Sequence, residues 1–415
     1  MSKAEKIFWA FVIRHKLKIF VAAATLLSLW ARYGLRTIVS GDMQHCLLPW
    51  YDVIAMNGGL RALSRQVGNY NIPYQTLIAL LTYLPVIPIY AYKGLSILFD
   101  YALGAAVSAG VYELTKSRTK AAVAYAATVL LPAVMLNSAA WGQCDSIFSF
   151  FMVASFVLLL RKKNIAAFLM YGCSFAFKLQ AVFFLPFLLF YYVWSKKISI
   201  LHFLLILVPM IVLSLGGLAQ GRGFESLFTI YRDQVTVDDP RISWNYPSFW
   251  LLLVKNIPSD GSDHYQELYI MCLAITVVIL GGIMLLYIRR ESLNSSSLLL
   301  LAVWLHYTCV FFLPSMHDRY AYPVVIFTLL ACFAEPKLIP AVLGHLILET
   351  EMYGSGLLFK EPLPWEILSL INLACYLHIA YIAAKSAGIA GTARSSRKRG
   401  PVPDSSAQDS TLQEA

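Results

Sequence analysis

The chain consists of apolar runs separated by short polar segments. Runs of this length and polarity predict α-helices that cross a bilayer, because a span needs about 20 apolar residues. We therefore predict an all-α, polytopic membrane protein with about 12 transmembrane helices. The apolar runs lie at residues 19–38, 74–91, 94–114, 120–139, 146–160, 165–177, 179–194, 198–219, 267–288, 296–313, 322–334, 337–349 and 366–384.

The stretch 40–73 differs from these runs because it contains Asp, Asn, Arg and Gly residues. Some of its apolar residues recur at helical spacing, which favours an amphipathic helix on the membrane surface. Both this stretch and Trp141 are expected on the outer side, yet three apolar runs lie between them. The number of crossings must be even, so one of two explanations holds. Either the run with Pro85 and Pro88 does not fully cross, or the basic residues 116–120 lie outside.

Composition narrows the class of protein. Of 415 residues, 59% are hydrophobic and 13% are charged, whereas soluble domains have about 25% charged residues. This excludes a soluble enzyme, a disordered chain and a fibrous protein, and the long apolar runs exclude an outer-membrane β-barrel. The formal net charge is +10. The basic residues form short clusters between apolar runs, which indicates membrane topology and not a nucleic-acid partner. The seven cysteines have no metal-binding or disulfide spacing.

The basic clusters orient the chain, because Lys and Arg concentrate on the cytoplasmic side. The segments 161–163, 196–197 and 289–290 are therefore expected inside, together with the N-terminus. We predict one membrane domain, residues 1–385, and a disordered cytoplasmic tail, residues 386–415. The predicted location is the inner (plasma) membrane.

With this orientation, four polar clusters fall on the extracytoplasmic side. Charged groups at membrane depth are costly and usually functional. Simpler roles stay open: Asp42 can be a loop residue, Asp145 can cap a helix, and Lys178 can reach the interface from a helix end. The candidate residues are Asp42, Trp50, Asp52 and Tyr74 in the first cluster, Gln143 and Asp145 in the second, Lys178 and Gln180 in the third, and His317, Asp318, Arg319 and Tyr320 in the fourth.

These clusters combine carboxylates, cations and amides. Such a set suits a substrate with hydroxyl groups and a phosphate, since Arg binds phosphate in a bidentate manner. The sequence has no nucleotide-binding glycine motif and no zinc spacing. We therefore expect a donor that already resides in the membrane. Cations can stabilise a monophosphate leaving group, so the chemistry requires no cofactor, and a divalent metal is not excluded.

The ordered motifs resemble those of membrane glycosyltransferases with the GT-C fold. Within this fold they are similar to a bacterial family of predicted mannosyltransferases, related to the second mannosyltransferase of GPI-anchor synthesis. Two positions depart from the family pattern, namely Cys144, where an aromatic residue is frequent, and Ile72, where a double proline is common. The motifs are Gly41-Asp42, Pro49-Trp50-Tyr51, Asn71-Ile72-Pro73-Tyr74, Trp141-Gly142-Gln143-Cys144-Asp145-Ser146, Phe177-Lys178-Leu179-Gln180 and Met316-His317-Asp318-Arg319-Tyr320-Ala321-Tyr322-Pro323.

The resemblance implies an enzyme that takes a hexose, with mannose favoured, from a polyprenyl-phosphate carrier. The acceptor is a glycan, a lipid or a protein on the outer face, as in the synthesis of cell-surface polysaccharide, and the anomeric centre is inverted. Asp42 matches the catalytic base in the first external loop. Lys178 and Arg319 match the cations that hold the donor phosphate. The remaining candidates would line the substrate site.

Three other functions stay open on the sequence. A transporter or flippase of lipid-linked sugars also has about 12 helices and buried charges, although no internal repeat is evident here. A polysaccharide polymerase or ligase with a lipid-diphosphate donor would use a large external loop. The charged loop 220–266 keeps that alternative open. A non-catalytic membrane scaffold is the third.

Overall fold

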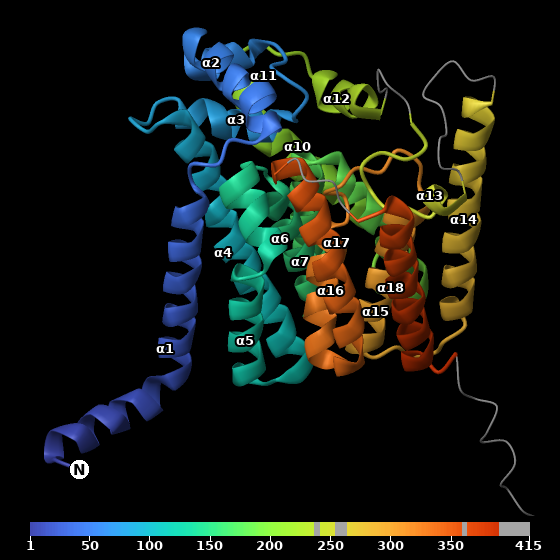
Figure 1. Ribbon diagram of the computed structural model, residues 1–415. Coiled ribbons are helices and arrows are strands. Elements are labelled where there is room, and N and C mark those ends of the chain that lie inside the picture. The colour runs from blue at the N-terminus through green and yellow to red at the C-terminus, as the bar shows by residue number, and fades with distance from the viewer. Residues whose placement is uncertain (236–240, 254–263, 359–362, 390–415) are drawn as a thin grey trace, which may run out of the picture.

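The computed structural model describes residues 1–235, 241–253, 264–358 and 363–389, and within them the protein is entirely helical. Most of the helices run roughly parallel in one bundle, and a smaller layer of short helices covers one end of it (Figure 1). The α-helices are α1 (Lys3–Leu35), α2 (Leu48–Met56), α3 (Ile72–Leu81), α4 (Pro88–Thr115), α5 (Arg118–Val129), α6 (Pro132–Met135), α7 (Asp145–Leu160), α8 (Asn164–Phe177), α9 (Leu185–Ser195), α10 (Leu207–Leu213), α11 (Leu215–Leu218), α12 (Ser226–Val235), α13 (Trp250–Leu253), α14 (Tyr265–Ile288), α15 (Ser295–Phe312), α16 (Tyr322–Ala334), α17 (Ile339–Leu358) and α18 (Trp365–Ser386).

Short 3₁₀ and π segments adjoin several of these helices. They occur where the chain bends within the bundle or passes into the covering layer. The 3₁₀ segments are η2 (Gly59–Ser64), η4 (Leu179–Phe184), η5 (Ile200–Ile206) and η6 (Pro336–Leu338), and the π segments are η1 (Met43–Leu47) and η3 (Leu136–Trp141).

The helices divide by their ability to cross a membrane. In the described residues, four are long and apolar enough, namely α4, α14, α15 and α18. A bent pair, α5 with α6 and η3, raises the number to five, and the remaining apolar helices are shorter. The prediction of a helical membrane protein therefore agrees with the structure, whereas the predicted count of about 12 is not confirmed. The predicted first span lies in α1, which is not one of the four.

Between Pro73 and Trp141, the described residues contain one helix that is long and apolar enough to cross, α4, and the bent pair of α5 with α6 and η3. The apolar run 74–91 is split between α3 and the start of α4, and Pro88 occupies the first turn of α4. With 10 residues, α3 is about 15 Å long, half of an apolar core of about 30 Å. The length of α3 therefore favours the first of the two explanations above, and α3 belongs to the covering layer beside α2 (Figure 1).

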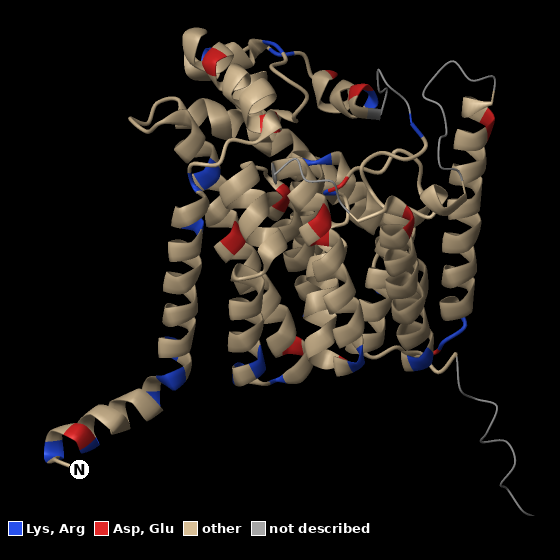
Figure 2. Cartoon of the chain, viewed as in Figure 1, with Lys and Arg blue, Asp and Glu red and all other residues tan. Residues whose placement is uncertain are grey.

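The opposite end of the bundle is basic. Lys and Arg residues gather at the lower ends of the helices in Figure 2. Glu113, near the end of α4, forms ion pairs with Lys116 (2.5 Å) and Arg161 (2.6 Å). Because these contacts join the α4–α5 turn to the α7–α8 turn, both basic turns lie at the same end of the bundle, as the predicted topology requires.

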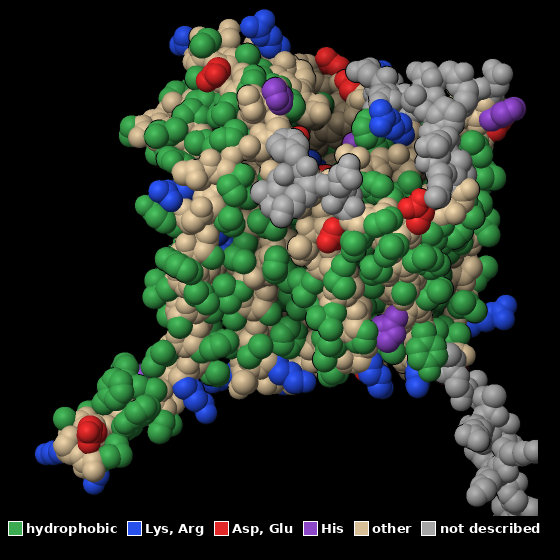
Figure 3. All heavy atoms as spheres, viewed as in Figure 1, with side chains coloured by type: hydrophobic (Ala, Val, Ile, Leu, Met, Phe, Trp, Pro, Cys, Tyr) green, Lys and Arg blue, Asp and Glu red, His purple; other side chains and the backbone are tan. Residues whose placement is uncertain are grey.

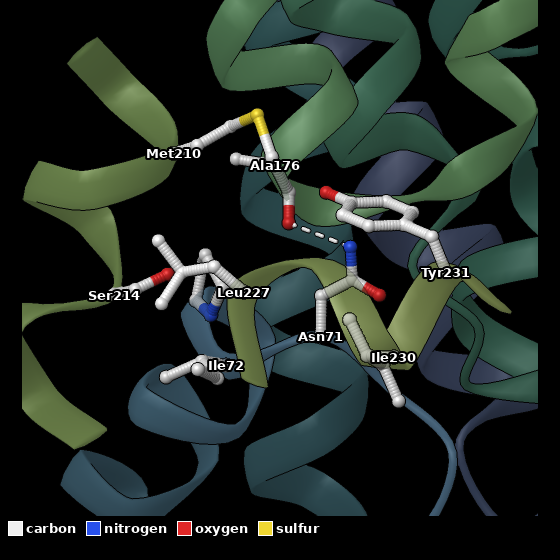
Figure 4. Close-up of a pocket in the computed structure, with 9 residues that line it drawn as sticks. Asn71, Ile72, Ala176, Met210, Ser214, Leu227, Ile230 and Tyr231 are labelled. Carbon is white, nitrogen blue, oxygen red and sulfur yellow. Dashed lines mark hydrogen bonds between the residues drawn. The ribbon is translucent and has the colours of Figure 1, made fainter. Parts of the chain in front are cut away.

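The covering layer is fastened to the bundle next to the motif that begins at Asn71. The Asn71 amide donates to the Ala176 carbonyl of α8 (3.0 Å) and accepts from Gln234 of α12 (2.9 Å). The Tyr231 hydroxyl donates to the Phe175 carbonyl (2.9 Å). Figure 4 shows Asn71 and Tyr231 on the wall of a small pocket between the two layers. In this motif, therefore, Asn71 holds the layers together.

Two predicted regions fall partly outside the described residues. The loop 220–266 contains α12 and α13, and its Asp238 and Asp239 lie outside the described part. The predicted tail begins at residue 386, whereas α18 ends at Ser386 and the description ends at residue 389.

Candidate active site

Asp42 lies seven residues after the end of α1 at Leu35, and it is the N-cap of η1. Its Oδ2 atom accepts hydrogen bonds from three side chains: the Trp141 indole (2.8 Å), the Gln143 amide (2.6 Å) and the Arg319 guanidinium (3.0 Å). The Asp42 side chain is nevertheless 38% exposed. A carboxylate that is held by three donors on one oxygen keeps a fixed orientation and can still meet a substrate.

Three predicted clusters thus meet at Asp42, although they lie far apart in the sequence. Figure 3 shows that the molecule is hollowed at the level between the covering layer and the bundle, with acidic and basic side chains inside the hollow. Charged residues also occur at this level in Figure 2, well above the basic end of the bundle. The cluster around Asp42 is therefore our candidate active site.

Both polar atoms of the Gln143 side-chain amide form hydrogen bonds. Its nitrogen donates to Asp42, and its oxygen accepts from the Tyr70 hydroxyl (2.6 Å). The Tyr70 ring packs against Tyr74 and Trp50 at centroid distances of 4.8 and 5.7 Å. These contacts favour a role for Gln143 in orienting the base. After these two contacts, the Gln143 amide keeps one free N–H for the hydroxyl groups of a substrate.

Asp145 is almost completely buried, with 1% of its side chain exposed. Its Oδ1 pairs with the Lys178 ammonium, while Oδ2 accepts from Asn137 (2.7 Å) and faces Arg319 Nη1 at 3.7 Å. The expectation that Asp145 caps a helix is wrong. Cys144 is the N-cap of α7, and no side chain caps this helix end. Asp145 therefore acts as the shared anionic partner of both cations.

Lys178 terminates α8 because its backbone turns to an extended conformation (φ −154°, ψ 134°). This turn directs the ammonium toward Asp145, and the side chain is 11% exposed. Burial disfavours the charged amine, but the Asp145 carboxylate outweighs this effect and holds the pKa of Lys178 above its ordinary value. The lysine within the apolar run thus has the anionic partner that its position demands.

Arg319 lies at the centre of the cluster. Besides Asp42, its guanidinium faces Asp145 (3.7 Å) and Asp318 (3.5 Å), and it stacks on the Trp141 ring at 4.8 Å. The Nε and Nη1 atoms are buried, and within the described residues they form ion pairs without a hydrogen bond. One nitrogen of the fork is thus fixed on Asp42, while the other two face the carboxylates of Asp145 and Asp318.

The loop between α15 and α16 carries the rest of the fourth predicted cluster. The His317 ring stacks on Trp244 (4.9 Å, 20° between the planes) and lies 5.1 Å from the Tyr320 ring. Burial, together with Arg319 and Lys178, lowers the pKa of His317 to about 4. The imidazole is therefore neutral at pH 7 and can donate or accept one hydrogen bond at each nitrogen.

The other predicted residues lie at the edge of this cluster or away from it. Tyr74 is buried behind Tyr70, and Gln180 is half-buried in the first turn of η4, two residues after Lys178. Trp50 packs beside Gly68. Asp52 is exposed on α2, and in the described residues no hydrogen bond or ion pair joins it to the cluster.

Several supporting residues were not among the predicted site residues. The Asn137 amide bridges Asp145 and the Tyr353 hydroxyl (2.8 Å), and the Tyr353 ring meets the Trp141 ring edge-on at 5.4 Å. Asn137 is a polar residue within an apolar run, and this was the signal that could have revealed it. Trp244 and Tyr353 carry no such signal, because isolated aromatic residues are common in membrane helices and at their ends.

The cluster contains three carboxylates, Asp42, Asp145 and Asp318, and two cations, Lys178 and Arg319. In the described residues, no group of three or more His, Cys, Asp or Glu side chains has an arrangement that could hold a metal ion.

A comparison with protein-family models matches residues 69–314 to glycosyltransferase family 87. The match covers more than half of the chain. The chain belongs to this family. No curated protein matches the chain. The matched segment contains Gln143, Asp145 and Lys178, whereas Asp42 and Arg319 lie on either side of it. This family-87 protein is therefore a membrane glycosyltransferase, and its fold brings Asp42 and Arg319 to the matched core.

Proposed function

We propose that this glycosyltransferase moves a hexose, with mannose favoured, from a polyprenyl-phosphate carrier to an acceptor on the extracytoplasmic face of the plasma membrane. Family membership supports the transfer of a sugar. The observation that carries the finer proposal is the Arg319 fork. Its Nη2 holds Asp42, while Nε and Nη1 are buried donors without a hydrogen bond in the described residues. A base and a phosphate-binding group are thus linked through one side chain.

Asp42 is the proposed general base. All three of its hydrogen bonds in the described residues end on Oδ2, so Oδ1 is available for an acceptor hydroxyl. A sugar hydroxyl is a weak nucleophile until a base takes its proton during the attack. The proton moves to Oδ1 as the acceptor oxygen bonds to the anomeric carbon. A single displacement of this kind inverts the anomeric centre.

The donor phosphate is the leaving group. As the bond between the anomeric carbon and the phosphate oxygen breaks, the electron pair stays on the polyprenyl phosphate. Negative charge then grows on this group, and preorganised cations stabilise it best. We assign this role to Arg319 through Nε and Nη1 and to Lys178. Asp145 holds both cations in place, and because it occupies part of their surface, the phosphate has to compete with it.

The substrate is expected to enter from the lipid. A polyprenyl chain needs apolar surroundings, and the apolar bundle beneath the cluster offers them. The orientation follows from the basic end of the bundle, which by the distribution of Lys and Arg is cytoplasmic. The cluster lies toward the opposite end and would face the outer side, where a lipid carrier and not a nucleotide presents the sugar.

The test uses the purified protein in nanodiscs with a panel of polyprenyl-phosphate hexoses and measures the release of polyprenyl phosphate. Asp42→Asn should lower turnover by about 10²–10⁴-fold, the usual contribution of a general base, and should leave donor binding intact. The matched control is Asp233→Asn, whose carboxylate is exposed on α12. Normal turnover by Asp42→Asn would refute the assignment of the base.

The same assay separates the other functions. Release of polyprenyl diphosphate from a diphosphate donor would indicate a polymerase or ligase. Movement of an intact lipid-linked sugar across proteoliposomes, without release of the carrier, would indicate a flippase.

A further inference from the structure

Lys93 lies on α4, on the side of the bundle where α1 ends, and it belongs to none of the motifs discussed so far. It is 2% exposed. Its ammonium donates to three carbonyl oxygens at the end of α1, those of Ile38 (2.6 Å), Arg36 (2.9 Å) and Leu35 (3.4 Å). Within the described residues, no carboxylate forms an ion pair with it. A buried cation that is held only by carbonyls is costly, so its retention calls for an explanation.

The three carbonyls belong to the segment that leads directly into the base. The last carbonyls of a helix have no partner within it, and a cation is favourable at this negative end of the helix dipole. Only three residues separate Ile38 from Asp42. The ammonium of Lys93 therefore fixes the direction in which the chain leaves α1, and with it the position of the carboxylate.

The stem of Lys93 lies near Gly142, on the other side of the junction between residues 35–43 and residues 141–143. Gly142 has a positive φ of 79°, and a Cβ atom there would lie 3.8 Å from Lys93 Cγ and 2.2 Å from Met43 Cε. Met43 is completely buried. Gly142 thus lets the chain that carries Trp141 and Gln143 pass close to Lys93 and Met43.

A pair of hydrogen bonds closes the junction. The Ser40 hydroxyl donates to the Trp141 carbonyl (2.9 Å) and accepts from the Met43 backbone N–H (3.1 Å). Residues 40–43, which carry the base, are thereby joined to residues 141–143, which carry two of its three hydrogen-bond donors. Lys93 lies at this junction: its ammonium holds the carbonyls of one side, and its stem lies near Gly142 on the other.

From this geometry we infer that Lys93 is a positioning residue for the proposed reaction: it fixes Asp42 against Trp141, Gln143 and Arg319 by holding the end of α1 to α4. The inference rests on the proposed role of Asp42 as base. Lys93 itself touches neither substrate. Its loss should therefore displace the base while the cations that bind the donor phosphate, Lys178 and Arg319, keep their places.

The experiment compares Lys93→Met with the wild type in the release assay. Methionine keeps an unbranched stem against Gly142 and removes the ammonium. We expect kcat to fall by about 10- to 100-fold, because a misplacement of about 1 Å can cost 10²-fold in rate. The KM values for donor and acceptor should stay within about twofold. Lys93→Arg, which restores donors to the carbonyls, should recover part of kcat.

The control is Lys116→Met, on the same helix but 68% exposed, which should behave as the wild type. Unchanged kcat in Lys93→Met would overturn the inference. So would a loss of kcat accompanied by an equal rise in the donor KM, because a general distortion of the fold produces that result. If Lys93→Met does not fold, Ser40→Ala tests the same junction without removing a charge. For this variant too, kcat should fall while the KM values stay nearly unchanged.

The outcome is separable from that of the proposed function. If Asp42→Asn turns over normally, the proposed function fails whatever Lys93 does. If Asp42→Asn is inactive while Lys93→Met and Ser40→Ala are fully active, only the present inference fails.

Discussion

Replacing Lys178 by methionine should both destabilise the protein and weaken donor binding, and these two effects can be separated. Lys178 and Asp145 form an ion pair in which the side chains are 11% and 1% exposed. Removing one partner of a buried pair costs about 3–5 kcal/mol, because it leaves an uncompensated charge. The fold therefore predicts a large loss of stability from a single substitution that removes few contacts.

The residual partners of Asp145 place the expected loss near the lower end of that range. Arg319 Nη1 remains 3.7 Å from Asp145, which corresponds to a gross attraction of about 4 kcal/mol at an effective dielectric constant of 20. The Asn137 hydrogen bond also remains. We therefore expect Lys178→Met to lower the free energy of unfolding by about 3 kcal/mol. The double variant Lys178→Met/Asp145→Asn removes both charges and should regain most of this loss.

The assay measures thermal unfolding and donor binding for the wild type, both single variants and the double variant in the same nanodiscs. Stability should recover in the double variant, whereas donor affinity should not, because the cation that meets the phosphate is still absent. If Lys178→Met is as stable as the wild type, the pair is not desolvated and the reasoning fails. If the double variant binds donor normally, Lys178 does not contact the phosphate.

Two further predictions concern acidity and topology. Burial raises the pKa of Asp318 although Arg319 opposes this, so the folded state favours the neutral acid and ionisation lowers stability at neutral pH. Asp318→Asn should raise the midpoint of thermal unfolding at pH 7 but not below about pH 3, where the acid is largely protonated in both the folded and the unfolded state. An unchanged midpoint at pH 7 would contradict this. In a background without native cysteines, Ser226→Cys should react with an impermeant thiol reagent on intact cells and Arg118→Cys only after permeabilisation. The reverse pattern would place the candidate site in the cytoplasm.

The polar clusters show how much of the site the sequence could reveal. Asp42, Gln143, Asp145, Lys178 and Arg319 stand out because charged and amide groups beside long apolar runs are expensive unless they are paired or functional. The structure brings all five together. Their roles did not follow from the pattern. On the sequence, Asp145 was a candidate for the substrate site or for a helix cap, and only its ion pairs show that it serves the two cations.

The helix count illustrates a different limit. Hydropathy located the apolar runs correctly, but it does not measure how far a helix continues in one direction. The run 74–91 satisfies the pattern of a span, yet α3 ends at Leu81 and α4 starts at Pro88. A proline in the first turn of a helix is favourable, because its missing N–H needs no partner there. The break was therefore visible in the sequence, while its consequence for topology was not.

By itself, the sequence determined that this protein is a helical membrane protein, and its basic turns predict an orientation in the membrane. Both properties follow from the cost of placing single residues in lipid, and that cost can be summed along the chain. Only the tertiary structure decided which oxygen of Asp42 is held, which cations share Asp145, and that Lys93 fixes the end of α1. These facts depend on contacts between residues as much as 277 positions apart. Local sequence patterns do not predict such contacts, because the contacts form only when whole helices pack against one another.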